Sequence, residues 1–339
     1  METSAMDSLV RRFAGRKILI VGDIIADEYI SGTSSRISRE APVLVLKFHS
    51  EHVRPGGAGN AAANVSSLGG TPLLVGVLGQ DRVGDEVRQW FTHAGISTDY
   101  LLTRDGAETT RKTRIMAGGH HTSKQQVIRI DRDQSPEIDR ELESEICDRL
   151  EHLLPEADGV IISDYGHGVL AERVRRSALD LAVHHRKVVC VDSRHDIRSF
   201  RGATLATPNE EEMEEACGHP VDRDDDLRRG GQSLRKELAL DALIVTRGRL
   251  GLTLFESSGN VEHYPIYGSD EVADVTGAGD TVAAVAALSL GAGGSFREAA
   301  YLANLAGGIV VMKRGAATLS PAELLAATEA AERWDERTE

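Results

Sequence analysis

Three features are scarce in this sequence of 339 residues: cysteine, long apolar runs and positive charge. Its cysteines, Cys147, Cys190 and Cys217, are too few and too scattered for a disulfide framework or a cysteine-based metal site, which favours a cytoplasmic protein. No apolar run approaches the ~20 residues of a membrane span. Residues 1–16 include acidic side chains and lack a continuous apolar core, so we expect neither a secretory signal peptide nor a membrane partner.

The charge balance argues against one broad class of partner. Acidic residues number 53 against 39 lysines and arginines, which gives a formal net charge of −14. Because a chain this acidic repels a phosphate backbone, we expect no general nucleic-acid binding. An anionic substrate would have to meet a local cluster of basic side chains.

The sequence contains a repeated pattern of strand followed by helix. Its length suits either one large domain with an appendage or two domains, and no internal repeat or low-complexity linker divides it. Short apolar runs of the kind found in strands buried on both faces alternate with amphipathic helices, which predicts an α/β fold. Strands are expected at residues 17–21, 73–78, 159–163, 187–191, 203–207 and 242–245.

The pattern changes between residues 103 and 132. Residues 109–117 and 126–131 alternate polar and apolar side chains around Gly118-Gly119, which predicts a hairpin with one solvent-facing side. With residues 30–48 it would form a small antiparallel sheet outside the main one, acting as a lid or a subunit interface. The region is basic, which favours either an anionic group on the substrate or a solvated strand face; its basic residues include Arg36, Arg39, Arg111, Lys112, Arg114 and Arg129.

The segment Asp274-Val275-Thr276-Gly277-Ala278-Gly279-Asp280-Thr281 ends an extended stretch and opens an alanine-rich helix. Its small residues expose successive N–H groups at a helix N-terminus, where donors are unpaired and the dipole is positive. One interpretation is an anion hole for a phosphoryl group, with Asp280 as the base for an attacking hydroxyl. The other is a glycine turn in which Asp280 supports the helix start. The segment alone leaves both open.

A second glycine-rich loop, Pro55-Gly56-Gly57-Ala58-Gly59-Asn60, precedes another alanine-rich helix at residues 61–68. Its glycines let the backbone pass close to a ligand, and Asn60 offers both a donor and an acceptor. Asn60 is equally well placed to cap the helix. Both roles are compatible with the sequence.

Further polar residues follow the predicted strands. Asp27 and Asp164 lie where open α/β sheets bind ligands, although each also suits a turn or a cap. His167 lies between two glycines, which predicts an accessible ring. Asn209 and Glu212 form the pattern of a capping box, and the same pair suits the water shell of a Mg²⁺ ion carried by nucleotide phosphates.

Three of these motifs carry a family resemblance. The segment 274–280 resembles the C-terminal signature of the PfkB (ribokinase-like) carbohydrate kinases, residues 56–61 resemble their N-terminal glycine signature, and Asn209-x-x-Glu212 resembles their magnesium-associated motif. They occur in the family's order over essentially the whole chain, with Val275 where many members have Thr. The resemblance implies a ribokinase-like three-layer α/β/α fold with a mostly parallel central sheet and a small antiparallel β lid. Residues 1–339 would form one kinase domain, with a lid from about 28–54 and 103–133.

Within that family, four segments are similar to the heptose 7-phosphate kinases of lipopolysaccharide-core precursor synthesis. Those enzymes phosphorylate the anomeric hydroxyl of D-glycero-D-manno-heptose 7-phosphate; some are fused to a C-terminal nucleotidyltransferase, and this chain resembles the stand-alone form. His167 departs from the lysine expected there. The segments are Gly22-Asp23-x-x-x-Asp27-x-Tyr29, Ser38-Arg39-Glu40-Ala41-Pro42, Gln125-Gln126-x-x-Arg129-Ile130-Asp131 and Ser163-Asp164-Tyr165.

The resemblance and the motifs together predict roles for individual residues. Asp280 would be the catalytic base, with the N–H groups of Gly277, Ala278 and Gly279 as the anion hole. The predicted substrate contacts are Asp27, Arg39, Gly56, Gly57, Asn60, Arg114, Arg129, Asp164 and His167. The predicted ATP contacts are Asn209, Glu212, Thr246, Gly248, Gly251 and Asn304, with Asn209 and Glu212 holding Mg²⁺ through water.

The same resemblance implies Mg²⁺ with ATP, a monovalent cation such as K⁺ and a homodimer formed through the lid. Two alternatives are kept. One is a ribokinase- or fructokinase-like kinase of an unphosphorylated sugar or nucleoside, in which Arg39, Arg114 and Arg129 would point away from the pocket. The other is a nucleotide- or sugar-binding regulator without catalysis, against which the intact segment 277–280 argues.

Overall fold

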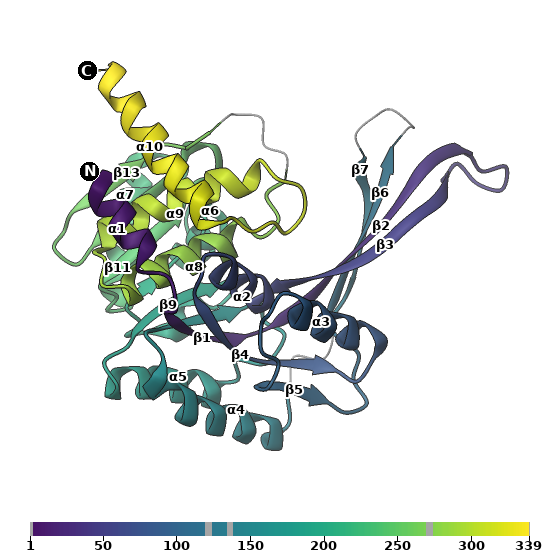
Figure 1. The fold of residues 1–339 in the computed structure, drawn as a ribbon, viewed down its shortest axis with the longest axis horizontal. Helices are drawn as coiled ribbons and strands as arrows, with labels where there is room; N and C mark the ends of the chain where they lie inside the picture. The colour runs from purple at the N-terminus through teal and green to yellow at the C-terminus, as the bar shows by residue number, and fades with distance from the viewer. Residues whose placement is uncertain (1–2, 119–123, 134–137, 269–273, 339) are drawn as a thin grey trace.

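A nine-stranded sheet forms the centre of the molecule (Figure 1). The computed structural model describes residues 3–118, 124–133, 138–268 and 274–338. The strand order is β13-β12-β11-β10-β9-β8-β1-β4-β5, and the pairs from β11 to β5 are parallel, while β12 and β13 pair antiparallel at one edge. The strands are β1 (Lys17–Gly22), β4 (Thr71–Gly79), β5 (Leu101–Arg104), β8 (Gly159–Asp164), β9 (Val188–Ser193), β10 (Leu205–Ala206), β11 (Ala242–Thr246), β12 (Leu252–Glu256) and β13 (Val261–Tyr264).

Helices cover both faces of this sheet, so that each face has its own apolar core. Phe91 and Val285 belong to one core and Ile146 and Phe200 to the other, and all four are fully buried. One face carries α1 (Thr3–Arg11), α2 (Ala58–Ser67), α3 (Arg82–His93), α8 (Ala278–Gly291), α9 (Phe296–Val311) and α10 (Pro321–Thr338). The other carries α4 (Arg140–Leu153), α5 (Glu172–His184), α6 (Glu210–Cys217) and α7 (Asp224–Glu237). Short 3-10 helices span Leu154–Glu156, Ile197–Phe200 and Gly248–Leu250.

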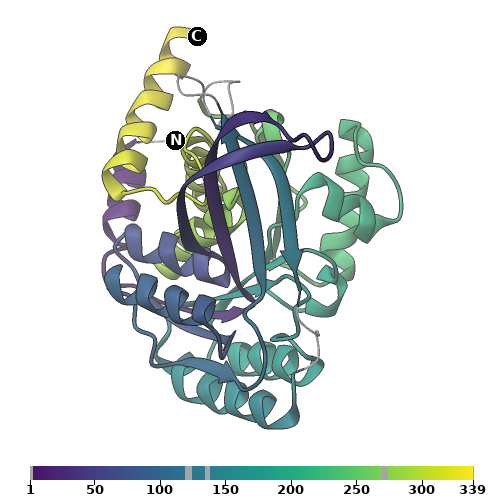
Figure 2. The same ribbon diagram turned by 90° about the vertical axis from the view of Figure 1, so that its right-hand side faces the viewer.

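A second sheet projects from the core as a curved lid, seen face-on in Figure 2. It consists of β2 (Ile24–Ile37), β3 (Leu44–Gly57), β6 (Arg111–Gly118) and β7 (Gln125–Arg132), in the order β3-β2-β6-β7. The sequence predicted an antiparallel sheet, but β2 and β6 pair in parallel. The reason is topological: both strands leave the core in the same direction, and the chain returns to the core through β3, α2, β4, α3 and β5 before it enters β6.

One local prediction about the lid was wrong, and one alternative is excluded. A turn was the alternative to ligand binding for Asp27, but only Asp23 separates β1 from β2, so Asp27 lies inside a strand. β7 was expected to have one solvent-facing side, but all its residues are exposed because no described part of the chain covers either face. The predicted glycine turn of the hairpin lies partly outside the described residues, since Gly118 ends β6 and Gly119 is not described.

The two ends of the described chain lie together, because α1 and α10 pack against each other (Figure 1). All three cysteines are free thiols. Among the helices that the structure describes, none combines the length and the apolar character needed to cross a membrane.

Candidate active site

Asp280 lies at the start of α8, where the main sheet meets the base of the lid. Its side chain is 3% exposed, and both carboxylate oxygens accept hydrogen bonds. The Nδ2 of Asn60, on α2, donates to Oδ2 at 2.8 Å, and the hydroxyl of Tyr165, after β8, donates to Oδ1 at 2.9 Å. Three segments far apart in the sequence therefore hold one carboxylate in a fixed orientation.

Burial raises the pKa of Asp280 to about 6, because an ionised carboxylate loses hydration inside the protein. The hydrogen bonds from Asn60 and Tyr165 oppose this shift by stabilising the charged form. A carboxylate with a pKa of about 6 is largely ionised at neutral pH and still basic enough to accept a proton from a hydroxyl, as a general base requires.

The link between Asn60 and Asp280 excludes one of the two interpretations of Asn60 and explains why residue 277 is a glycine. Asn60 does not cap α2: Gly57 occupies the N-cap position, and Asn60 lies within the first turn with its side chain directed to α8. Asn60 also donates to the carbonyl oxygen of Gly277 at 3.2 Å. At Gly277, φ is 79° and a β-carbon would collide with the Asn60 amide, so both the backbone conformation and the space require glycine.

The predicted anion hole has fewer available N–H donors than the sequence suggested. The N–H of Ala278 donates to the carbonyl oxygen of Val275 at 3.2 Å, so it would have to leave that bond to bind an anion. The N–H groups of Gly277 and Gly279 make no backbone hydrogen bond with any described residue. These two donors at the N-terminus of α8 suit a phosphoryl oxygen.

A cleft of about 500 Å³ extends from the start of α8 along the ends of β9, β10 and β11. All the residues predicted to contact ATP line this one cleft: Asn209, Glu212, Thr246, Gly248, Gly251 and Asn304. Apolar side chains form another part of its wall, namely Leu252, Ile266, Val275, Val282, Ala303 and Val311. The cleft thus combines polar groups near α8 with an apolar wall of the kind that accommodates a flat base.

Asn209 and Glu212 form the capping box that the sequence allowed. Glu212 N–H donates to Asn209 Oδ1 at 2.8 Å, and Asn209 N–H donates to Glu212 Oε2 at 2.9 Å. Burial raises the pKa of Glu212. Within the described part of the chain, no cluster of three or more histidine, cysteine, aspartate or glutamate residues could cage a metal. The side-chain oxygens of Asn209 and Glu212 are of the kind that can hold Mg²⁺ through water.

Arg247 connects this capping box to the loop after β11. Its side chain is 5% exposed; Nε contacts Glu210 Oε1 at 2.8 Å and Nη2 contacts Asp224 Oδ1 at 2.9 Å. Thr246, directly before it, forms an isolated bridge with Asn209. These contacts hold the starts of α6 and α7 against one wall of the cleft.

A polar cluster under the lid faces the Asp280 site. Asp27 Oδ1 lies 3.0 Å from Arg114 Nη2, and both side chains are buried. Asp27 Oδ1 and Arg114 Nη1 nevertheless lack a hydrogen-bond partner among the described residues. Burial raises the pKa of Asp27, and Arg114 opposes that shift. A buried acceptor and a buried donor without partners suit a hydroxylated ligand.

Glycines let the backbone approach this polar cluster closely. A β-carbon on Gly56 would collide with the Asp27 carboxylate, and one on Gly57 would contact the Tyr165 ring at 3.3 Å. Asp27, Arg114, Gly56, Gly57 and Asn60 are the predicted substrate residues that the fold brings together.

The other predicted substrate residues lie elsewhere. Arg39 is exposed in the turn between β2 and β3, and Arg129 pairs with Asp131 at 2.9 Å on the exposed strand β7. Asp164 accepts hydrogen bonds from Ser193 Oγ at 2.9 Å and from the N–H of Gly166 at 3.1 Å, so its carboxylate supports the loop after β8.

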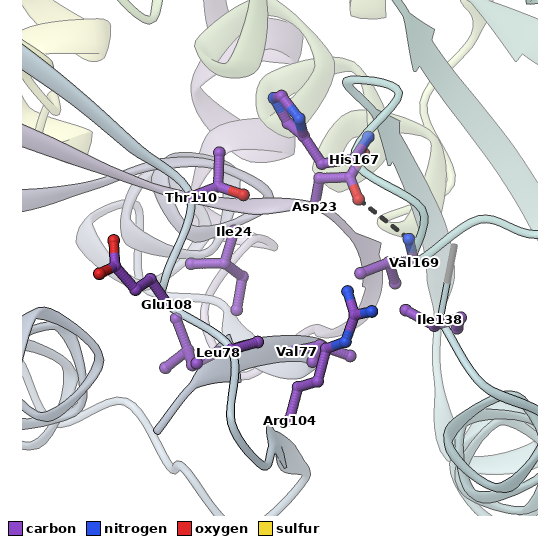
Figure 3. Close-up of a pocket in the computed structure, with 12 residues that line it drawn as sticks. Asp23, Ile24, Val77, Leu78, Arg104, Glu108, Thr110, Ile138, His167 and Val169 are labelled. Atoms are coloured by element: carbon purple, nitrogen blue, oxygen red, sulfur yellow. Dashed lines mark hydrogen bonds between the residues drawn. The ribbon is translucent and has the colours of Figure 1, made fainter. Parts of the chain in front are cut away.

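His167 lines a separate small cavity of about 30 Å³ beside Asp23 and Arg104 (Figure 3). Its Nε2 lies 4.0 Å from Asp133 Oδ1. Asp23, which is buried, accepts hydrogen bonds from the N–H groups of Tyr165 at 2.8 Å, His167 at 3.1 Å and Val169 at 3.1 Å. Asp23 thereby fixes the loop that presents Tyr165 to Asp280.

Sequence reasoning missed Tyr165 and Asp23 as site residues. Both stood in segments that resembled the family, Gly22-Asp23 and Ser163-Asp164-Tyr165, and Asp23 follows a predicted strand just as Asp164 does. No local pattern shows that a phenol after β8 reaches a carboxylate on α8. Only the packing of α8 against β8 and β9 brings them together.

Comparison with known proteins shows the family of this chain. The sequence model of the pfkB family carbohydrate kinases matches residues 16–323. The bifunctional protein HldE of Trichlorobacter lovleyi is 38% identical over 328 residues, and that of Paramagnetospirillum magneticum is 38% identical over 327 residues. Each alignment covers 96% of this chain and 66% of the relative, so the chain spans just under two thirds of the length of these curated relatives.

Solved structures show the same fold. Ribokinase of Arabidopsis thaliana, complexed with ribose and ATP, superimposes with a TM-score of 0.71 at 18% identity, covering 93% of this chain and 99% of that one. Phosphofructokinase-2 of Escherichia coli, in complex with potassium, gives a TM-score of 0.74 at 17% identity, covering 94% and 99%.

The fold and the family match together define a ribokinase-like carbohydrate kinase, with a three-layer α/β/α core and a β lid, as the sequence predicted. The chain belongs to the PfkB family of carbohydrate kinases, which are phosphotransferases with an alcohol group as acceptor.

Proposed function

We propose that this ATP-dependent carbohydrate kinase transfers the γ-phosphoryl group to the anomeric hydroxyl of D-glycero-D-manno-heptose 7-phosphate. Support comes from the four segments that resemble heptose 7-phosphate kinases and from the 38% identity to the bifunctional protein HldE of several bacteria. The observation that carries the kinase chemistry is the buried carboxylate of Asp280, held between the nucleotide cleft and the base of the lid.

The proposed reaction assigns one task to each part of the site. The sugar hydroxyl attacks the γ-phosphorus as the bond to the leaving ADP oxygen breaks, and Asp280 takes the hydroxyl proton. The N–H groups of Gly277 and Gly279 stabilise charge on the phosphoryl oxygens. Asp27, Arg114 and Asn60 hold sugar hydroxyls. Closure of the lid excludes water, which Asp280 would otherwise activate in place of the sugar.

The proposal includes Mg²⁺ bound with ATP. Asn209 and Glu212 would hold it through water, and their lone pairs not used in the capping box suit that role. Bound there, Mg²⁺ would neutralise phosphate charge in a cleft with several carboxylates. A monovalent cation such as K⁺ also remains a proposal, which activity in K⁺ against activity in tetramethylammonium would test.

One observation favours the alternative of an unphosphorylated sugar. That alternative expected Arg39, Arg114 and Arg129 to point away from the pocket, and within one chain only Arg114 lies by Asp27. Arg114 is itself paired with that carboxylate.

A phosphorylation screen with Mg-ATP tests the proposal. Heptose 7-phosphate is compared with heptose, ribose and fructose 6-phosphate at equal concentrations, and ADP release and the phosphorylated product are both measured. We expect heptose 7-phosphate to give the highest kcat/KM. Turnover of unphosphorylated sugars alone would reject the heptose phosphate assignment, and binding of nucleotide without turnover of any sugar would favour a regulator.

We further propose that two chains associate through their lids in the cytoplasm. The outer part of the lid exposes apolar side chains that no described residue covers: Ile37, Val43, Leu44, Phe48, Val127, Ile128 and Ile130. Exposed apolar side chains gathered on one sheet favour burial against a partner.

A further inference from the structure

The nucleotide cleft is lined by several acidic side chains, although its proposed ligand is itself an anion. Its described lining includes the carboxylates of Asp192, Glu210, Glu211 and Glu212, and Arg194 is the one lysine or arginine among the described residues that line it. A triphosphate carries several negative charges, so a cleft of this composition needs each available cation. Arg194, in the loop after β9, is the protein's own candidate.

Arg194 has a counterpart on the lid. The guanidinium carbon of Arg194 lies 5.0 Å from the centre of the Tyr165 ring, and Lys112 Nζ, from β6, lies 5.6 Å from the same centre. The hydroxyl of that ring donates to Asp280. One aromatic ring thus brings a core cation and a lid cation close to the proposed base.

Neither cation has a direct ion-pair partner among the described residues. Arg194 and Lys112 form no ion pair and no side-chain hydrogen bond with a described residue. Lid arginines on either side of Lys112 are paired, Arg111 with Glu28 at 3.4 Å and Arg114 with Asp27 at 3.0 Å. Half-burial and the charge of Arg194 lower the pKa of Lys112, and the carboxylates of Asp131 and Asp27 oppose that shift.

We propose that Arg194 and Lys112 form a two-part cation clamp on the phosphoryl group during transfer, Arg194 from the nucleotide side and Lys112 from the lid. The inference rests on the proposed kinase reaction. As the bond to ADP breaks and the bond to the sugar oxygen forms, negative charge spreads over the three other phosphoryl oxygens. The clamp offsets that charge, and Tyr165 keeps both cations near Asp280. Lid closure then contributes a charge to the reaction in addition to excluding water.

The first experiment measures nucleotide affinity without sugar, so it does not depend on the acceptor. Binding of AMP-PNP and of ADP, each with excess Mg²⁺, is compared by calorimetry in wild type and Arg194→Met. We expect AMP-PNP affinity to fall at least tenfold and ADP affinity to change less than about threefold, because only AMP-PNP carries the terminal phosphoryl group. The matched control is Arg249→Met, which removes an exposed arginine from the neighbouring loop and should leave both affinities unchanged.

The second experiment separates the lid cation from the core cation. Lys112→Met should leave AMP-PNP affinity without sugar unchanged and should lower kcat at least thirtyfold with the best acceptor of the screen. Lys47→Met removes an exposed lid lysine and should leave kcat unchanged. Arg194→Lys, which keeps the charge, should recover part of the affinity lost in Arg194→Met.

Two results would overturn the clamp. An unchanged ratio of AMP-PNP to ADP affinity in Arg194→Met would mean that Arg194 does not meet the terminal phosphate. A wild-type kcat in Lys112→Met would remove the lid cation from the reaction. Failure of the proposed function is distinguishable, because a wild-type protein that phosphorylates no sugar would still give the nucleotide affinities of the first experiment.

Discussion

At the scale of single residues, Asp280 shows how burial and charge are balanced in this site. Burial raises the pKa of the carboxyl, and two hydrogen-bond donors oppose that shift by stabilising the ionised form. Asn60 and Tyr165 hold the two oxygens separately, so the loss of either donor leaves the other in place.

Replacement of the base is the first prediction. Asp280→Asn should lower kcat about 10²–10⁴-fold, the range for loss of a general base. The stability of the folded protein, in contrast, should not fall. The pKa of Asp280 in the folded protein lies above its ordinary value, so ionisation of this carboxyl lowers the free energy of unfolding from about pH 4 upward, and by the full amount above about pH 6. Thermal unfolding at pH 8 should show an unchanged or higher Tm, whereas Asp241→Asn, at an exposed position, should change neither quantity. Near wild-type turnover would reject Asp280 as the base.

The pH dependence of the reaction is the second prediction. Since Asp280 must be ionised to accept a proton, kcat/KM for the sugar should fall as pH decreases through about 6. Tyr165→Phe removes a donor that lowers this pKa, so the acid limb should move to higher pH. Complete pH profiles of both proteins test this, and identical acid limbs would contradict the assignment.

Gly56 provides the third prediction. In Gly56→Ala the added β-carbon would press on the Asp27 carboxylate, which Arg114 holds in place. We expect KM for the sugar to rise about tenfold with little change in KM for ATP, because the nucleotide cleft is separate. Gly291→Ala is the matched control, since its nearest neighbours lie at 3.4 Å, an ordinary contact distance. A larger effect on ATP than on sugar would place Gly56 outside the sugar site.

At the scale of elements, the nucleotide cleft depends on how α6, α7 and the loop after β11 are joined. Arg247 makes that junction, and its guanidinium is buried whereas Asp224 is largely exposed. The capping box of Asn209 and Glu212 starts α6 at the same place. The residues that cap this helix are thus the same ones that we propose to hold Mg²⁺ and ATP.

Removal of this junction is the fourth prediction. Arg247→Ala should raise KM for ATP several-fold and lower the free energy of unfolding by about 1–3 kcal/mol, since charge-assisted hydrogen bonds of a buried side chain are lost. Arg229→Ala removes a largely exposed arginine that pairs with Asp226 on α7, and should cost less than about 1 kcal/mol. Denaturant unfolding and ATP kinetics of both variants measure the contrast. If Arg247→Ala and Arg229→Ala changed the free energy of unfolding and KM for ATP equally, burial of Arg247 would not explain its contribution.

At the scale of the whole molecule, the lid is the part of the fold left uncovered. Its strands extend from the core (Figure 2). Its outer half carries exposed apolar side chains on β3 and β7. An uncovered sheet of this kind favours aggregation unless a partner buries it. A second copy of the chain is the proposed partner.

Assembly through the lid is the fifth prediction. Phe48, which is 61% exposed, should become buried between two lids, and Phe48→Glu should shift the protein toward monomer. Val183→Glu, at a 70% exposed position on α5, is the control and should leave the mass unchanged. Sedimentation velocity over a concentration series measures both. A wild-type monomer at assay concentration would reject the dimer.

The sequence by itself determined the class of fold and the kinds of groups in the site. Apolar runs of strand length that alternate with amphipathic helices leave few arrangements besides a mostly parallel sheet between helices. The glycine-rich segments and the Asn209–Glu212 pair are local, because each lies within one turn or one helix start. Such features depend on neighbouring residues, so they can be read along the chain.

Tertiary structure decided which groups meet. The parallel pairing of β2 with β6, the contact of Tyr165 with Asp280 and the positions of Arg194 and Lys112 near the Tyr165 ring all join residues that are distant in sequence. Their proximity follows from how α8 packs on the sheet and where the lid leaves the core, which no local pattern specifies. Asn60 illustrates the difference: its sequence position suited a helix cap, and packing instead directed its amide to the Asp280 carboxylate.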